Sequence, residues 1–215
     1  MEGTGPVVKE QRNVSGFTKV GSSISANIFI RTASEFKVEI EGQKNILDLL
    51  KTEVVDGLLK IKFEPNVNVN SHKDMNIYIS APAFEEIKLS GSGDLKAGNT
   101  LTGQSLKLHL SGSGNVIIPD AQYADLQCHL SGSGDIKLGG KAGSASMSIS
   151  GSGNVNSSGL EAKSVTATIS GSGDLACMAT ESLDAKVSGS GNISYSGHPG
   201  AVKSRVSGSG EVKGK

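Results

Sequence analysis

The 215-residue sequence contains no tryptophan, and aromatic residues make up only 4% of it. A site that grips sugars or bases by stacking them on several aromatic rings therefore has little material. An excess of one charge is also missing, because 21 lysines and arginines balance 21 acidic residues. Without a net positive charge, a protein that binds nucleic acid is not expected.

Long apolar runs are missing as well. No stretch approaches the roughly 20 apolar residues that a membrane-spanning helix needs. Residues 1–6 have neither the basic nor the apolar region of an export signal. We therefore expect either a protein of the cytosol or an exported protein whose signal has been removed.

What the sequence does have is glycine, and the glycines recur with a period. Ser-Gly-Ser-Gly occurs seven times at spacings of 18 to 21 residues, and a fixed period of this length is typical of a solenoid. Each copy has an apolar residue before it, and an acid or amide followed by an apolar residue after it. The copies begin at Ser90, Ser111, Ser131, Ser150, Ser170, Ser188 and Ser207.

The segments between the copies have the pattern of strands. Apolar and polar residues alternate over Leu106–Leu110, and the same parity returns one repeat later at Leu126, Cys128 and Leu130. About 20 residues suit a coil of two or three short strands, and stacked coils can pair in parallel at about 4.8 Å. We predict an all-β parallel solenoid. Gly-Ser-Gly forms the corners, where glycines adopt positive φ and serine hydroxyls satisfy backbone groups.

The residue after each corner alternates between acid and amide. Carboxylates in successive coils would lie about 5 Å apart and repel, so an intervening asparagine spaces the charge and can bridge by hydrogen bonds. The alternative is calcium held along this ladder, since carboxylates and carbonyls are its preferred ligands. A 20-residue period with half the acids replaced fits known calcium repeats poorly. The ladder consists of Asp94, Asn115, Asp135, Asn154, Asp174, Asn192 and Glu211.

Residues 1–84 lack the repeat but contain all five phenylalanines. Strand patterns cover 24–30, 36–40, 58–63 and 76–79. A helix is predicted over 45–51, with Asn45 as N-cap and Asp48 at its third position. Asp56-Gly57 predicts a hairpin turn between 52–55 and 58–63. We interpret 1–84 as a cap on the open end of the solenoid of residues 85–215, with an independent N-terminal domain as the alternative.

No catalytic, cofactor-binding or metal-binding residues are predicted. Cys128 and Cys177 lie about two coils apart, beyond the reach of a disulfide, and are expected to be buried free thiols. His109 and His129 should stack on the outer face, in a column whose other members supply no further metal ligand. His72 and His198 lie in loop-like sequence and receive no role. The corner serines lack a positioned base, paired acids beside an aromatic cleft are not visible, and no phosphate-binding loop occurs.

The segments 37–42, 45–62 and 77–82, followed by Ile87–Asp94 and the Ser-Gly-Ser-Gly-Asp/Asn repeat, resemble the putative auto-transporter adhesin head GIN domain family of exported Bacteroidetes proteins. The resemblance covers residues 10–215. It implies a right-handed parallel β-helix similar to pectin-lyase-like solenoids, with no catalytic residues, a role in cell adhesion, and trimers by analogy with other adhesins. It supplies no binding residues.

Together, the residues and the resemblance predict a non-enzymatic exported protein of the periplasm, outer membrane or cell surface. Its partner would be a host or bacterial surface ligand, either glycan or protein, with no cofactor. A polysaccharide-active β-helix enzyme and a calcium-binding solenoid are the alternatives. Charged residues at the last strand edge, Glu211, Lys213 and Lys215, predict a monomer or weak oligomer in isolation, while a trimer is allowed on the cell surface.

Overall fold

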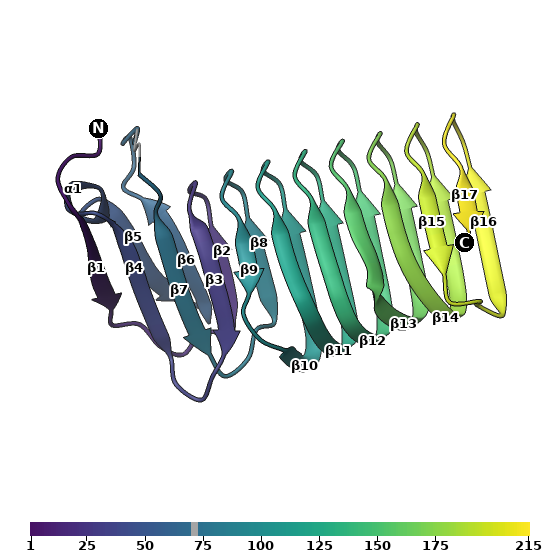
Figure 1. Cartoon of the computed structure of the whole chain (residues 1–215), viewed down its shortest axis with the longest axis horizontal. Helices are drawn as coiled ribbons and strands as arrows, with labels where there is room; N and C mark the ends of the chain where they lie inside the picture. The colour runs from purple at the N-terminus through teal and green to yellow at the C-terminus, as the bar shows by residue number, and fades with distance from the viewer. Residues whose placement is uncertain (70–72) are drawn as a thin grey trace.

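The computed structural model describes residues 1–69 and 73–215, and it is an elongated stack of β-coils (Figure 1). Five strands form the regular part: β10 (Leu101–Leu110), β11 (Val116–Leu130), β12 (Ile136–Ile149), β13 (Val155–Ile169) and β14 (Leu175–Val187). Each pairs in parallel with the next, about one repeat later. The predicted parallel β-solenoid with about 20 residues per coil is therefore confirmed.

The strands form one continuous sheet that bends along each coil, and the pairing of β11 with β12, of β12 with β13 and of β13 with β14 shifts in register there. In β11 and β12 the shifts fall between Ile118 and Ala121 and between Lys137 and Gly139. The residues before the bend form what we call the first sheet, and those after it form the second sheet. The last coil adds β15 (Ile193–Ser196) and β17 (Val212–Gly214) to the first sheet and β16 (Ala201–Val206) to the second.

The N-terminal strands extend both sheets but not in chain order. The first sheet begins with β1 (Val7–Arg12), β4 (Lys37–Gln43), β7 (Asn76–Ala81), β3 (Asn27–Thr32) and β9 (Leu95–Ala97). The second begins with β5 (Leu50–Val55), β6 (Leu58–Phe63), β2 (Lys19–Ser22) and β8 (Glu86–Leu89). β2 and β3 thus lie between strands that follow them in the sequence.

The predicted hairpin at Asp56-Gly57 is confirmed. β5 and β6 pair antiparallel with Val55 opposite Leu58, and both turn residues have positive φ, 52° for Asp56 and 73° for Gly57. Two consecutive positive φ values define the turn type that Asp-Gly favours in two-residue hairpins.

The predicted helix is shorter and begins earlier than expected. α1 spans Lys44–Leu47, its N-cap is Gln43, and Asp48 is the C-cap rather than the third helical residue. Asn45 lies inside the helix. Its side chain instead donates to the backbone oxygen of Glu2 at 2.9 Å and accepts from the backbone nitrogen of Thr4 at 3.0 Å. The N-cap prediction was wrong because β4 continues to Gln43, so no free helix start is left at Asn45.

One apolar core runs through the stack, from Phe17 and Leu47 near one end to Ile193 near the other. The last strand of the second sheet leaves this core uncovered: Val202 and Val206 occupy inward positions beside Leu183 and Val187, yet they are 43% and 46% exposed. No helix in the described parts of the chain is long and apolar enough to cross a membrane.

The corner glycines serve a different purpose from the one predicted. Of the fourteen glycines in the seven corners, Gly208 alone has a positive φ. A Cβ on Gly112 would stand 1.8 Å from the carbonyl oxygen of Gly91, and one on Gly134 would stand 1.8 Å from that of Gly114. The corners stack so closely that only glycine leaves room for the backbone of the previous coil.

The corner backbone is satisfied by the neighbouring corner rather than by serine hydroxyls. The backbone nitrogen of Ser133 donates to the oxygen of Gly112 at 3.3 Å, and Ser152 and Ser172 donate to their preceding corners in the same way. The corner serine side chains are exposed, and Ser111 Oγ contacts the oxygen of Leu89 at 3.4 Å. Serine is therefore a small polar residue at the corner surface, and its hydroxyl is not what holds the corner together.

The structure also reveals an eighth corner that the repeat pattern conceals. Residues 23–27 (Ser-Ile-Ser-Ala-Asn) join β2 to β3 and stack under Ser90–Asp94, because β2 pairs with β8 and β3 with β9. Cβ atoms on Gly91 and Gly93 would meet the carbonyl oxygens of Ile24 and Ala26 at 2.3 and 2.0 Å. The predicted strand over 24–30 is thus a corner followed by β3.

Candidate binding surface

The acid and amide ladder forms a continuous hydrogen-bonded column along the corners. Asn115 donates its backbone nitrogen and Nδ2 to the same Oδ1 of Asp94, at 2.8 and 2.9 Å. Asn154 bonds Asp135 and Asn192 bonds Asp174 in the same two-fold manner. Each following acid donates its backbone nitrogen to the amide oxygen before it, as Asp174 does to Asn154 at 3.0 Å.

This geometry explains the alternation of acid and amide. A carboxylate can only accept hydrogen bonds, whereas an amide side chain both donates and accepts, so each asparagine links the acid before it to the backbone after it. One oxygen of each aspartate already accepts two N–H groups. Within the described residues, no group of three or more His, Cys, Asp or Glu side chains could hold a metal ion.

The two histidines lie one above the other as predicted, with their rings edge to face. His109 and His129 occupy equivalent positions in β10 and β11, with ring centroids 6.2 Å apart. His109 lies 3.7 Å from Glu86, and His129 Nδ1 contacts Ser148 Oγ at 2.6 Å. Desolvation lowers the pKa of His109, a shift that the carboxylate of Glu86 opposes. His198 lies apart, with φ of 55° in the last loop, and His72 falls outside the described residues.

Both cysteines are buried free thiols, as predicted. Burial raises the pKa of the Cys128 thiol to about 12 and that of Cys177 to about 11. Because the thiolate is the reactive form, neither side chain is placed or charged to act as a nucleophile.

An exposed aromatic pair stands out on the first sheet. Phe29 on β3 and Tyr78 on β7 are opposite each other in the parallel ladder. Their rings stack with centroids 5.2 Å apart and an interplanar angle of 16°, and each residue is 36% exposed. The exposed parts of these two stacked side chains form an apolar platform open to solvent.

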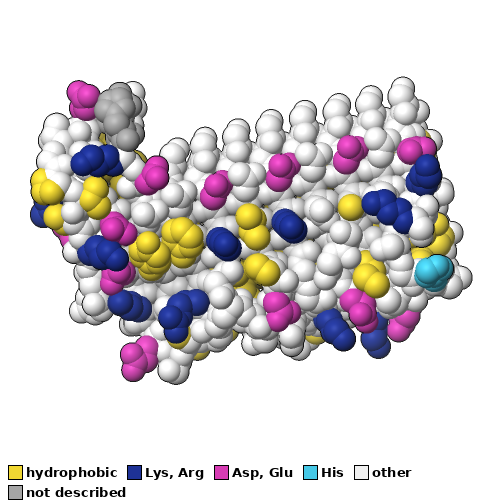
Figure 2. Space-filling model, viewed as in Figure 1, with side chains coloured by type: hydrophobic (Ala, Val, Ile, Leu, Met, Phe, Trp, Pro, Cys, Tyr) yellow, Lys and Arg dark blue, Asp and Glu magenta, His cyan; other side chains and the backbone are white. Residues whose placement is uncertain are grey.

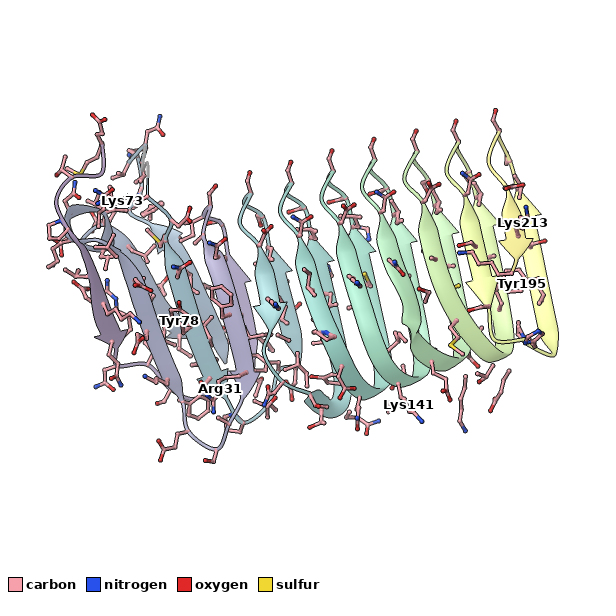
Figure 3. The ribbon with its side chains drawn as sticks, viewed as in Figure 1. Arg31, Lys73, Tyr78, Lys141, Tyr195 and Lys213 are labelled. Carbon is pink, nitrogen blue, oxygen red and sulfur yellow. The ribbon has the colours of Figure 1, made fainter. Side chains whose placement is uncertain are left out.

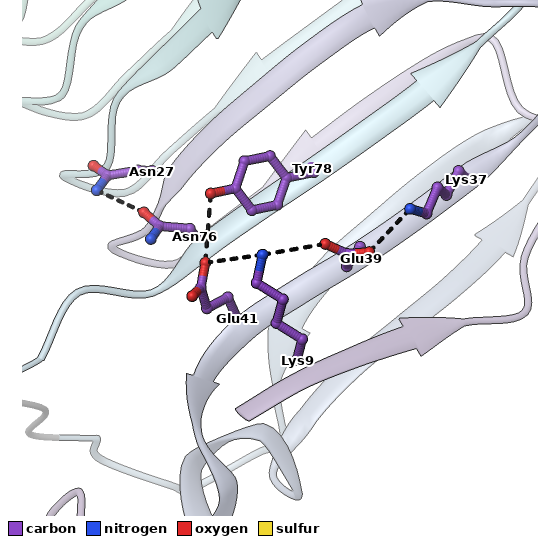
Figure 4. A network of polar contacts seen from close by, with 7 residues as sticks. All are labelled: Lys9, Asn27, Lys37, Glu39, Glu41, Asn76 and Tyr78. Carbon is purple, nitrogen blue, oxygen red and sulfur yellow. Dashed lines mark hydrogen bonds and ion pairs between the residues drawn. The ribbon is translucent and has the colours of Figure 1, made fainter. Parts of the chain in front are cut away.

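Charged and amide groups surround this platform (Figure 4). Lys9 Nζ lies 5.5 Å from the centre of the Tyr78 ring and between two acids, 3.7 Å from Glu39 and 3.8 Å from Glu41. Lys37 contacts Glu39 at 2.9 Å, and its hydrogen bond is the main cause of the lowered pKa of Glu39. On the corner side of the platform, Asn27 donates to Asn76 at 3.1 Å.

The platform continues along the solenoid as a row of alternating charge and apolar surface. The parallel strand pairing places Phe29 beside Lys96, Lys96 beside Ile117, and Ile117 beside Lys137. Figure 2 shows hydrophobic and basic side chains alternating across this face, with a parallel line of acidic side chains nearer the corners. We call residues Tyr78, Phe29, Lys96, Ile117 and Lys137 the front row.

The two lysines of the front row have no ion-pair partner among the described residues, and Ile117 is 37% exposed. Tyr78, Arg31 and Lys213 are labelled on the same face in Figure 3. Arg31 follows Phe29 by two residues and lies beside Ser80. The front row therefore combines an aromatic platform, an apolar residue and unpaired cations in one line.

Sequence reasoning missed this surface, since it assigned no role to Phe29 or Tyr78. The two residues are 49 positions apart and meet because β3 inserts beside β7, against the order of the chain. The alternation of each strand contained one signal. Phe29 lies between Ile28 and Ile30, and Tyr78 lies between Ile77 and Ile79, so each aromatic residue occupies a position whose side chain points to solvent.

A hollow of about 570 Å³ lies between the 23–27 corner and residues 67–69 and 73–75. Ile24 and Ala26 line it together with Phe63 and Met75. Lys73 and Asp74 are the charged residues among its described lining.

Comparisons with known proteins agree with the fold. A family model described as putative auto-transporter adhesin, head GIN domain, matches residues 16–199. The structure of a putative adhesin from Bacteroides fragilis NCTC 9343 superposes with a TM-score of 0.97, at 31% identity and over 100% of both chains. No protein of curated function matches.

Two further solved structures share the fold at lower identity. A putative lipid binding protein from Parabacteroides distasonis ATCC 8503 has a TM-score of 0.83 at 24% identity, covering 100% of this chain and 99% of that one. A putative adhesin from Parabacteroides merdae ATCC 43184 has a TM-score of 0.79 at 23% identity, covering 100% and 98%.

Proposed function

Since this chain belongs to the putative auto-transporter adhesin head GIN domain family, we propose that it is an exported, non-enzymatic adhesin that binds a surface glycan along the front row. The observation that carries the proposal is the exposed Phe29 and Tyr78 stack, continued by unpaired Lys96 and Lys137. The exposed parts of these two stacked side chains form an apolar surface that a ligand can cover.

The chemistry of the row fits a glycan. Aromatic faces pack against the apolar faces of sugar rings, and the lysines supply hydrogen-bond donors and charge. The corner-side acids Asp94 and Asp135 each use one oxygen for the ladder, which leaves the other to accept sugar hydroxyls.

The spacing of the lysines narrows the class of glycan. Lys96 and Lys137 are two coils apart, about 10 Å at the spacing of paired strands, with Ile117 between them. An acidic group on roughly every second sugar would meet each lysine in turn. This fits a glycan with isolated acidic groups, while the zero net charge of the chain speaks against a dense polyanion.

A polysaccharide-cleaving enzyme is the weaker candidate. Such enzymes need one carboxyl group with a raised pKa to act as acid. The acids nearest the aromatic platform are Glu39 and Glu41; both contact Lys9, and the pKa of Glu39 is lowered. Lysine partners that favour the charged form make this pair poorly suited to donate a proton.

The test is a panel of neutral, carboxylated and sulfated polysaccharides, scored for binding by affinity electrophoresis and for released reducing ends in the same samples. We expect retardation by carboxylated or sulfated glycans without reducing ends. Lys96→Gln should weaken the retardation, and Lys186→Gln, on the second sheet, should not. Sustained release of reducing ends, or no retardation by any glycan, would overturn the proposal.

A further inference from the structure

A missing side chain creates a hollow on the second sheet, on a different surface from the front row. In the outward row of this sheet, Gly21 of β2 lies between Lys60 of β6 and Lys88 of β8. Glycine leaves its place in the row empty. A hollow of about 240 Å³ results, lined by Gly21, Lys60, Lys62, Lys88, Ser23 and Ser90 among others.

Lysines outnumber acids around this hollow. Lys62 pairs with Glu53 and Lys88 with Glu86, both at 2.8 Å. Lys60 has no ion-pair partner among the described residues. Lys19, two residues before Gly21 on β2, is close enough to Glu86 to contribute to the lowered pKa of that acid.

The existing ion pairs do not neutralise the site. The side chains of Lys62 and Lys88 remain 44% and 48% exposed, and exposed ion pairs of this kind stabilise a protein only weakly. A multiply charged anion in the hollow can therefore replace Glu53 and Glu86 as the ion-pair partner of Lys62 and Lys88, while Lys60 can pair with the anion without first leaving an acid.

Lysine and serine residues make up most of the lining of the hollow. A Cβ on Gly21 would stand 3.5 Å from a methyl group of Leu58, so Leu58 lies beside the glycine but outside the lining. Lys60, Lys62 and Lys88 line the hollow together with Ser23 and Ser90, both of which are exposed, while the ammonium groups of Lys62 and Lys88 contact Glu53 and Glu86. Lysines bind phosphate as movable point charges, and hydroxyls add donors to its oxygens.

We propose that the Gly21 hollow binds a phosphate group, with Lys60 and Lys88 gripping it from the two sides and Lys62 from the corner side. The group can belong to free phosphate, to a phosphorylated sugar or to a lipid headgroup, because the hollow recognises the charge and size that these share. Whatever carries the phosphate extends outward from the sheet, since the hollow lies at the outward position of Gly21 between Lys60 and Lys88.

The first experiment titrates the full chain with inorganic phosphate and follows the backbone amides by NMR. We expect saturable shifts at Gly21 and its neighbours, at least fivefold weaker binding in Lys60→Gln, and unchanged binding in Lys186→Gln. Lys186 is an exposed lysine further along the same sheet, which controls for general charge. Gly21→Thr fills the hollow with a residue suited to a strand and should abolish the shifts while the other resonances show a folded protein.

The second experiment identifies the source of the phosphate. Titration with a sugar phosphate and flotation with vesicles containing phosphatidic acid are compared between the parent, Gly21→Thr and Lys186→Gln. Loss of binding in Gly21→Thr but not in Lys186→Gln supports the site, and the ligand for which this loss is seen identifies the source of the phosphate group. The proposal is wrong if no arm gives saturable binding, or if Lys186→Gln weakens binding as much as Lys60→Gln does.

Discussion

Asn154 places two hydrogen bonds on a single oxygen of Asp135, one from its backbone nitrogen at 3.1 Å and one from Nδ2 at 2.9 Å. Its own Oδ1 accepts the backbone nitrogen of Asp174 at 3.0 Å. One asparagine thus links three successive coils and separates two negative charges.

Asn154→Asp should destabilise the protein by about 1 kcal/mol. The change removes the Nδ2 donor and puts three carboxylates in consecutive coils, where like charges directly opposite each other repel by this amount. Because these side chains are exposed, salt should restore part of the loss. Urea unfolding at low and high NaCl measures the effect.

Asp135→Asn is the matched control, because it keeps an oxygen to accept from Asn154 and removes charge instead of adding it; its effect should be smaller. Melts of the parent and Asn154→Asp in EDTA, NaCl and CaCl₂ separate the structural ladder from the calcium alternative. A rise in melting temperature that calcium alone produces in the parent would contradict the structural interpretation.

Gly134→Ala should cost about 3 kcal/mol or more. The added Cβ would stand 1.8 Å from the oxygen of Gly114, and two stacked backbones have to separate to admit it. At Gly159 the nearest atom is 3.6 Å away, so Gly159→Ala should be close to neutral. Equal chemical denaturation curves for the two variants would show that close stacking does not explain the corner glycines.

The buried thiols predict a loss of stability at alkaline pH. Burial in the folded state raises the pKa values of Cys128 and Cys177 to about 12 and 11 from 9.0. Above pH 9 the two thiols therefore stay protonated in the folded protein, whereas they lose their protons in the unfolded chain. The stabilisation is complete below pH 9 and falls as the pH rises toward the folded values, roughly 1.4 kcal/mol per thiol and pH unit.

Urea unfolding at pH 8 and pH 10 tests this against the double variant Cys128→Val, Cys177→Ala, which lacks both thiols. The parent should lose more stability than the double variant over this interval. Parallel losses would mean that the thiols ionise as easily in the folded protein as in the unfolded one.

We propose that residues 1–84 act as a cap and not as an independent domain. They supply β2 and β3, which cover the edges of β8 and β9. A fragment of residues 85–215 would expose these edges and the core beneath them, so we expect aggregation or loss of cooperative unfolding. A soluble fragment that unfolds cooperatively, as measured by scattering and thermal melts, would favour separate domains instead.

The sequence was sufficient for the features that repeat locally. Parity placed Leu110, Leu130 and Ile149 in one inward column, and the ladder residues were identified from their place after each corner. These features depend on neighbours one coil away, which are about 20 residues apart in the sequence. At this separation the repeat period itself indicates which residues stack on each other.

The features that escaped sequence reasoning depend on the order of stacking or on contact at atomic distance. Phe29 meets Tyr78 only because β3 inserts out of chain order, and the 23–27 corner stacks on a corner 67 residues later. The sequence suggested that the corner glycines adopt positive φ. Glycine is instead required because a Cβ at Gly112 or Gly134 would stand 1.8 Å from the oxygen of Gly91 or Gly114, a contact between coils that the sequence of one coil does not reveal.

The most direct test of the functional account is the affinity of one retained glycan for the parent and for the double variant Phe29→Ala, Tyr78→Ala, measured by calorimetry. Both side chains are exposed, so the variant should fold normally. We predict at least tenfold weaker binding to the variant, because the change removes both aromatic rings of the platform, and loss of one aromatic stacking partner costs about 1–3 kcal/mol in the case of nucleic-acid bases. Equal affinity for the two proteins would contradict the account.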